Sequence, residues 1–317
     1  MTQRKSRFLS FVLISACILS VFSCKTVGRN YMDNLEINYL TVRTFFEATP
    51  PDILIRMKEI QDLTIPGPAG EIKVRLYIPE NVKTDSPVLF YIHGGGFVMG
   101  SINHVDKYVR LLARETNMPA ISIDYRLAPE NPWPAALEDC KAAYLWAETN
   151  AENFFGGKNR NFIVAGESAG ANLATSLTHW RTAEGLKQPV AQILYSPFVA
   201  GPKSKKGSML ASREINAPFS SITPQSIDFF NRAYTGNNKE LYKEPYVFPV
   251  LQKSFSALPP AFITICQLDT LRDDGYTYAA LLRRDGVKVK TMYLIAKDHA
   301  WIGSSVIKKT AKFIDGL

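Results

Sequence analysis

Apolar residues along the chain follow two alternating patterns. Short continuous apolar runs, at residues 88–92 and 162–165, are typical of central strands that are covered on both faces. Residues 71–79 instead alternate between apolar and polar positions, which predicts a half-buried strand. Further strand-like stretches lie at residues 119–129, 191–197, 260–269 and 288–296.

Stretches with helical spacing of apolar residues lie between these runs, at residues 104–117, 133–151 and 277–286. Strands that alternate with helices of this length require crossover connections, so the pattern predicts an α/β fold with a mainly parallel sheet. Residues 30–62 also carry apolar residues at helical intervals. Residues 201–242 break the alternation and are interpreted as an insertion over the sheet, partly helical.

The N-terminal end has the pattern of a targeting segment. Basic residues within positions 4–7 precede an apolar run, Phe8 to Phe22, whose length of about 15 residues suits a signal sequence better than a membrane span. The run ends before Cys24 and resembles a bacterial lipoprotein signal, with Cys17 as a competing site. We expect an exported protein attached to the membrane of the cell envelope. Plain secretion and a retained N-terminal anchor are the alternatives.

Composition and charge argue against a disordered, nucleic-acid-binding or metal-dependent protein. The 46% hydrophobic content is enough for a large core, and the net charge of +8 is not arranged in a basic stripe of the kind that binds nucleic acid. No His/Cys cluster has metal-ligand spacing, so we expect no metal and no cofactor. Cys140 and Cys266 are expected to be buried, unbridged thiols. The oligomeric state stays open.

A serine stands between two glycines where an extended run gives way to a helical one. The sequence Gly166-Glu167-Ser168-Ala169-Gly170 follows a strand and opens a helix, as in the turn that exposes a nucleophilic serine. Side chains at the two glycine positions would clash in so sharp a turn. The alternative is an ordinary turn of small residues.

A histidine and three glycines, His-Gly-Gly-Gly at residues 93–96, follow another predicted strand. Acyl transfer needs main-chain donors around one oxyanion, and glycines allow that close approach. We expect the N–H groups of Gly94, Gly95 and Ala169 to form this oxyanion hole. A phosphate-binding loop is the alternative, but the chain has no Gly-Lys-Ser/Thr here.

One of the four histidines falls where a catalytic base is expected. His299 follows the last predicted strand, and Asp269 stands at the end of the strand before it, which agrees with the chain order Ser–Asp–His. Asp298, Asp273 and Asp274 are the competing acids. The predicted triad is therefore Ser168, His299 and Asp269.

These motifs together resemble the hormone-sensitive-lipase family of α/β-hydrolases, which includes bacterial carboxylesterases and arylacetamide deacetylases. The matching segments are His-Gly-Gly-Gly at 93–96, Tyr-Arg-Leu-Ala-Pro-Glu at 125–130, Pro-Trp-Pro-Ala-Ala at 132–136, Gly-Glu-Ser-Ala-Gly at 166–170, Leu-Asp-Thr-Leu-Arg-Asp-Asp at 268–274 and Asp-His-Ala-Trp at 298–301. Ala171 and Ala300 replace glycines that are common in the family after the serine turn and after the catalytic histidine.

The resemblance implies a domain organisation. After the signal peptide that the N-terminal pattern predicts at 1–24, it implies an N-terminal cap segment at 25–65 and an α/β-hydrolase domain at 66–317, with a cap insertion at about 201–240. It implies supporting roles for His93, Gly96 and Glu167 beside Gly166 and Gly170.

The expected activity is that of a serine carboxylesterase acting on small-molecule esters of short to medium acyl groups through an acyl-enzyme. Amide deacylation, acyl transfer and non-catalytic binding of a small molecule are the alternatives.

Overall fold

The structure is a computed structural model, which describes residues 34–50, 52, 54–83, 85–157, 160–201 and 210–317. Within these ranges the strands form one eight-stranded sheet. Their bounds are β1 Glu59–Gly67, β2 Gly70–Ile78, β3 Val88–Ile92, β4 Ala120–Asp124, β5 Phe162–Glu167, β6 Ala191–Tyr195, β7 Ala261–Cys266 and β8 Val289–Leu294. The predicted signal peptide lies outside the described residues.

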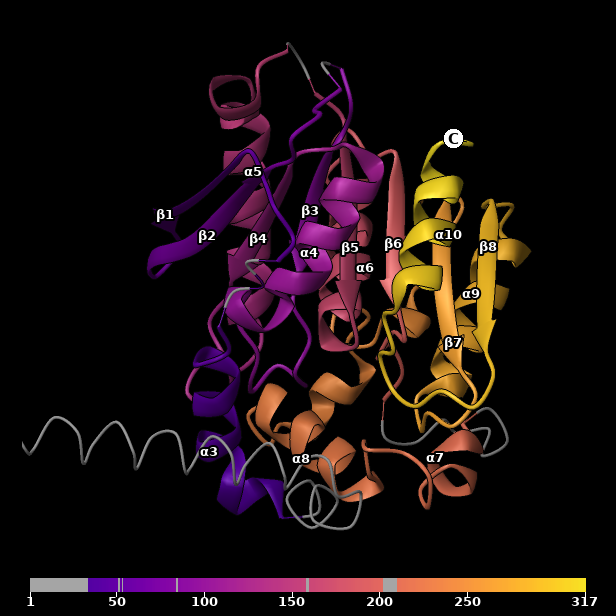
Figure 1. Ribbon diagram of the computed structural model, residues 1–317. Helices are drawn as coiled ribbons and strands as arrows, with labels where there is room; N and C mark the ends of the chain where they lie inside the picture. Colours follow the sequence, from indigo (N-terminus) through magenta and orange to yellow (C-terminus); the bar gives the residue numbers. More distant parts are fainter. Residues whose placement is uncertain (1–33, 51, 53, 84, 158–159, 202–209) are drawn as a thin grey trace, which may run out of the picture.

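The sheet is mainly parallel, as the sequence predicted (Figure 1). The strand order is β1-β2-β4-β3-β5-β6-β7-β8, and every pair from β4 to β8 is parallel. Strand β2 runs antiparallel to both of its neighbours, β1 and β4. The carboxyl ends of the six parallel strands therefore meet at one edge of the sheet, where active sites of open α/β sheets are found.

Helices cover both faces of the sheet. Their bounds are α3 Leu35–Glu47, α4 Ile102–Thr116, α5 Ala135–Phe155, α6 Ala169–Ala183, α7 Ser212–Ile215, α8 Pro224–Tyr234, α9 Arg272–Arg284 and α10 Ser304–Ile314, with the short 3₁₀ helices η1 Lys239–Lys243 and η2 Pro249–Leu251. Helices α4 and α10 pack on one face, and α5, α6 and α9 on the other (Figure 1). None of the described helices has both the length and the hydrophobicity required to cross a lipid bilayer.

The apolar runs of the central strands fill two cores, one on each face of the sheet. In β3, Phe90 packs in the core beneath α5 and α6, whereas Leu89 and Tyr91 pack in the core beneath α4 and α10. Every residue of β3, β5, β6 and β7 is buried, which confirms the predicted central strands. Cys140 and Cys266 are buried and unbridged, also as predicted.

The described residues within the interval 30–62 are helical only in part. Helix α3 occupies Leu35–Glu47, but Glu59 already begins β1, and the strand extends past the boundary expected at residue 65. The helical interpretation of the last residues of this interval is wrong because they pair with β2 in an antiparallel hairpin that turns at Gly67 and Gly70. Pairing with a neighbouring strand overrides a weak local pattern here.

The insertion after β6 contributes α7 and α8, and α3 contacts α8. These three helices lie beyond the carboxyl ends of the strands, at the bottom of the view in Figure 1. Helix α8 buries Ile227, Phe230 and Tyr234 and lies in the insertion that the sequence predicted to be partly helical.

Candidate active site

The serine predicted as the nucleophile stands in the turn between β5 and α6. Ser168 has φ 54° and ψ −118°, a strained conformation for a residue with a side chain. A Cβ added at Gly166 would lie 2.6 Å from the main chain of Gly170, and one at Gly170 would lie 2.1 Å from the carbonyl oxygen of Ile92. Neither position can accept a side chain, so this turn requires both glycines.

Gly94 does not have the role predicted for it. Its N–H donates a 2.6 Å hydrogen bond to Oε1 of Glu167, and the residue does not line the pocket that contains Ser168, whereas Gly95 and Gly96 do. The assignment of Gly94 as an oxyanion donor is therefore wrong, because the buried Glu167 carboxylate needs that donor for itself. Among the described residues, none accepts a main-chain hydrogen bond from Gly95, Gly96 or Ala169. These three N–H groups remain available to an oxyanion.

The imidazole of His299 is held by Asp269. Its Nδ1 donates a 2.8 Å hydrogen bond to Oδ2 of Asp269, whose Oδ1 accepts one of 2.8 Å from the N–H of Leu271. Because the carboxylate only accepts, Nδ1 carries the proton and Nε2 keeps a lone pair. Burial alone lowers the pKa of His299, but the charge of Asp269, with smaller contributions from Asp298 and Glu167, holds that pKa above its ordinary value.

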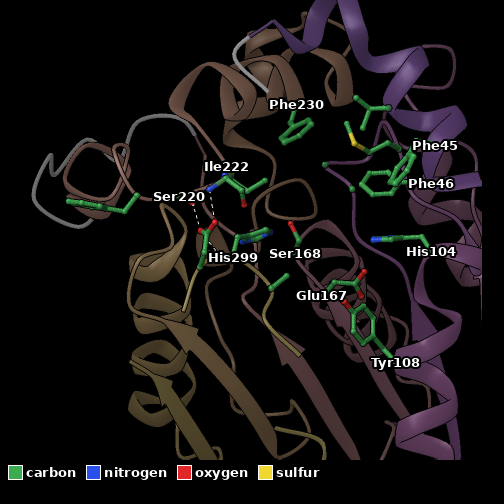
Figure 2. Close-up of a pocket in the computed structure, with 18 of the residues that line it drawn as sticks. Phe45, Phe46, His104, Tyr108, Glu167, Ser168, Ser220, Ile222, Phe230 and His299 are labelled. Carbon is green, nitrogen blue, oxygen red and sulfur yellow. Dashed lines mark hydrogen bonds between the residues drawn. The ribbon is translucent and has the colours of Figure 1, made fainter. Parts of the chain in front are cut away.

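Ser168 and His299 line the same pocket and lie side by side in Figure 2. The His299 ring is hydrogen-bonded to Asp269, and no hydrogen bond joins it to the Ser168 hydroxyl. Hydrogen bonds of this kind commonly tighten only when substrate binds. The arrangement thus provides a hydroxyl, a base with a free lone pair and an orienting acid on neighbouring loops.

Asp298, the main competing acid, forms its hydrogen bonds with groups other than the imidazole ring. Its Oδ1 accepts hydrogen bonds from the hydroxyl of Ser220 at 2.8 Å and from the main-chain N–H of His299 at 2.6 Å. Its Oδ2 accepts one from the N–H of Ser221 at 2.7 Å. Asp298 therefore connects the inserted segment to the histidine loop and does not orient the imidazole.

The other two competing acids also have structural partners. Asp273 accepts a 2.8 Å hydrogen bond from the N–H of Ser212, and the fully buried Asp274 forms a 2.9 Å ion pair with Arg213. Both carboxylates are thus occupied in fastening the insertion to α9.

His93 supports the glycine loop from behind. Its Nδ1 donates to the carbonyl oxygen of Gly94 at 2.7 Å, and its ring stacks on Tyr125, with centroids 4.2 Å apart. The hydroxyl of Tyr125 donates to the carbonyl oxygen of His93 at 2.9 Å. Burial lowers the pKa of His93 to about 4, so the ring is neutral at physiological pH. Tyr125 belongs to one of the quoted motifs, but no pattern in the sequence indicates its contact with His93.

Glu167 is buried between the glycine loop and the serine turn. Burial raises its pKa to about 7, against the opposing effect of the hydrogen bond from Gly94. The carboxyl therefore changes its charge near neutral pH while it touches the loop that carries the candidate oxyanion donors.

The pocket has a volume of about 460 Å³, within the usual range for small-molecule sites. Residues of α3, the glycine loop, α4, the segment 218–222, α8 and the histidine loop form its walls. Its mostly apolar lining includes Val42, Phe45, Phe46, Met99, Pro218, Phe219, Ile222 and Phe230.

Helix α3 is fastened over this pocket by an arginine that sequence reasoning missed. Arg43 donates to the carbonyl oxygens of Val98 and Ala128 at 2.8 Å each, and it forms a 2.9 Å ion pair with Glu130. Since two acceptors are main-chain atoms, no sequence pattern could reveal these contacts.

The fold and the site are those of an α/β-hydrolase. A family profile described as "alpha/beta hydrolase fold" matches residues 89–303. The chain belongs to the hormone-sensitive-lipase family of these proteins, which confirms the resemblance inferred from its motifs.

Similar proteins include several with esterase names. The carboxylic ester hydrolase LipN of Mycobacterium tuberculosis is 35% identical over 276 residues, which cover 85% of this chain and 71% of that protein. The carboxylesterase NlhH of the same organism is 33% identical, over 88% of this chain and 86% of its own. Among solved structures, a hyperthermophilic esterase from the archaeon Pyrobaculum calidifontis is 31% identical and has a TM-score of 0.78, over 91% of this chain and 96% of that one.

Proposed function

We propose that this protein is a serine carboxylesterase that hydrolyses esters of short to medium acyl groups. The observation that carries the proposal is the hydrogen bond between His299 and Asp269 beside Ser168, in a pocket that also presents unused main-chain donors. The esterase names of the relatives described above support the same reaction class.

The reaction begins when Nε2 of His299 removes the proton of the Ser168 hydroxyl as its oxygen attacks the ester carbonyl. Asp269 fixes the imidazole tautomer and stabilises the imidazolium that forms. The N–H groups of Gly95, Gly96 and Ala169 bind the oxyanion of the tetrahedral intermediate. The imidazolium then protonates the leaving alcohol. In the second half of the reaction, His299 removes a proton from the water that attacks the acyl-enzyme, and it returns that proton to Ser168 as the carboxylic acid leaves.

Substitution of the nucleophile tests the proposal. Ser168→Ala is expected to abolish hydrolysis of p-nitrophenyl acetate and labelling by a fluorophosphonate probe, with thermal unfolding monitored to show that the variant folds. Full activity in a folded Ser168→Ala protein would refute the assignment. Comparison of ester and amide substrates, with and without an acceptor alcohol, separates hydrolysis of esters from amide deacylation and acyl transfer.

We further propose that the protein is an exported lipoprotein attached to the cell envelope. The support is the basic start within residues 4–7 and the apolar run that ends before Cys24. Mass spectrometry of the mature N-terminus tests this, because an unmodified chain that begins at Met1 excludes both cleavage and lipidation.

A further inference from the structure

One imidazole in the pocket wall takes no part in the proposed mechanism. His104, near the N-terminal end of α4, lines the pocket, and its ring forms no hydrogen bond with any described residue. Its Nδ1 is buried without a partner. In Figure 2 the ring lies on the opposite side of Ser168 from His299 and directs a nitrogen into the cavity. Because Nδ1 is closed off, the ring nitrogen that faces the cavity is Nε2, which has no hydrogen-bond partner among the described residues and can bond to a ligand.

The proposed reaction determines which part of a substrate reaches His104. The leaving alcohol must face His299, because that imidazole gives it a proton. The acyl group therefore extends away from His299, towards the wall formed by His104, Phe46 and Tyr108. This wall is the acyl end of the pocket.

The charge state of His104 restricts the group that it can recognise. Burial, with a smaller effect from His93, lowers the pKa of His104 to about 4, so its ring is neutral and offers one donor and one acceptor. A neutral imidazole also offers no positive charge to pair with a carboxylate. An uncharged hydroxyl matches these surroundings, since it both donates and accepts.

The neighbours of His104 favour an aromatic carrier for that hydroxyl. The ring of Phe46 lies against the imidazole with centroids 4.3 Å apart, and Phe45 follows at 6.0 Å from Phe46. The phenol ring of Tyr108 lines the same end of the pocket. Aromatic groups stack well on such surfaces.

We propose that His104 is a specificity-determining residue that binds a hydroxyl group on an aromatic acyl moiety, so that the enzyme prefers hydroxyaryl esters to their unsubstituted counterparts. The proposal rests on the proposed esterase function. A site built to bond a hydroxyl discriminates against an analogue that lacks it, because the protein group then stays unpaired.

The test compares matched pairs of p-nitrophenyl esters. The acids are phenylacetic, 3-phenylpropanoic and 4-phenylbutanoic acid, each with its 4-hydroxyphenyl counterpart, so that three distances from the carbonyl are sampled. The wild-type protein is expected to prefer the hydroxylated ester by about 3- to 10-fold in kcat/KM for at least one pair. His104→Phe, which keeps a planar ring without nitrogen, is expected to bring that ratio to within about twofold of one.

Two further variants make the comparison specific. His104→Gln restores a donor and an acceptor and is expected to recover part of the preference. Glu115→Gln changes an exposed residue of the same helix and is expected to keep the wild-type ratio. Labelling by the fluorophosphonate probe shows which variants have a folded site.

A wild-type ratio near one for all three pairs overturns the inference without any variant. An undiminished ratio in a labelled His104→Phe protein also overturns it. If p-nitrophenyl acetate and all six esters resist hydrolysis and the probe does not label Ser168, the proposed esterase function itself fails.

Discussion

Replacement of Asp269 by Asn tests whether this carboxylate, and not the neighbouring Asp298, orients the imidazole of His299. The Asp269 side chain is fully buried and accepts the hydrogen bond of His299 Nδ1 at 2.8 Å. An amide there can donate to Nδ1, which would leave the proton on Nε2, where it blocks attack by Ser168. The same exchange in serine proteases costs about 10⁴-fold in kcat, so we expect a loss on the order of 10³–10⁴-fold, or about 4–5.5 kcal/mol of transition-state stabilisation.

The pH profile should change in a defined direction. Activity needs neutral His299, so it falls as pH decreases through the pKa of that residue, which Asp269 and other carboxylates hold above its ordinary value. Asp269→Asn removes the attraction and leaves burial, which lowers the pKa of a histidine. The acidic limb of the residual activity should therefore move to lower pH in Asp269→Asn.

The assay is hydrolysis of p-nitrophenyl acetate from pH 5 to 9, with single-turnover kinetics for the acylation step. Asp298→Asn is the matched control, since that carboxylate bonds to Ser220, Ser221 and the main chain of His299 and not to the ring. We expect it to retain kcat within about tenfold. A larger loss in Asp298→Asn than in Asp269→Asn, or a limb that moves to higher pH in Asp269→Asn, would refute the assignment of Asp269.

Three other outcomes are expected. Gly170→Ala should lower the free energy of unfolding by about 3 kcal/mol or more in urea titration, because the new Cβ meets a main-chain oxygen; a change below about 1 kcal/mol would contradict the close packing. The pKa of Glu167 is raised by burial from 4.5 to about 7, so this carboxyl contributes stability below pH 4.5 that is lost as pH rises through 7. In urea titrations, the free energy of unfolding of Glu167→Gln relative to that of wild type should therefore increase by up to about 3 kcal/mol between pH 5 and pH 8. The same relative value at both pH values would exclude this linkage. Arg43→Ala should raise KM for p-nitrophenyl butanoate by at least about threefold with a smaller change in kcat, because α3 loses its fastening over the pocket; an unchanged KM would show that α3 holds its place without Arg43.

Sequence reasoning predicted the strands best where burial on both faces leaves a continuous apolar run. It failed for β1, an edge strand in which Ile65 alone is fully buried, because so few buried positions leave no alternating pattern in the sequence. The serine turn was also predictable, because its backbone geometry restricts which residues can occupy it. Its two glycines are required by main-chain distances that any such turn must have.

The roles of the glycines in the loop 93–96 were harder to predict. Each of the three consecutive glycines allows the close main-chain approach that an oxyanion hole requires. Only the position of the Glu167 carboxylate decides which of their N–H groups is already hydrogen-bonded. That carboxylate arrives from another strand, so its effect has no signature within the motif. The contacts of Arg43 and Asp298 escaped prediction because their partners are main-chain atoms or residues distant in sequence.

Strand register, more than any single side-chain contact, brings the candidate site together. Ile92 at the end of β3 is level with Gly166 near the end of β5, so the glycine loop and the serine turn leave the sheet side by side. Cys266 and Leu294 end β7 and β8 at the same level, and the loops that carry Asp269 and His299 start there. A slip of one residue between β3 and β5 would turn the apolar side chains of one strand to the opposite core and move the glycine loop along the sheet edge. The two buried cores that stabilise the fold therefore also fix the distance between the oxyanion donors and the nucleophile.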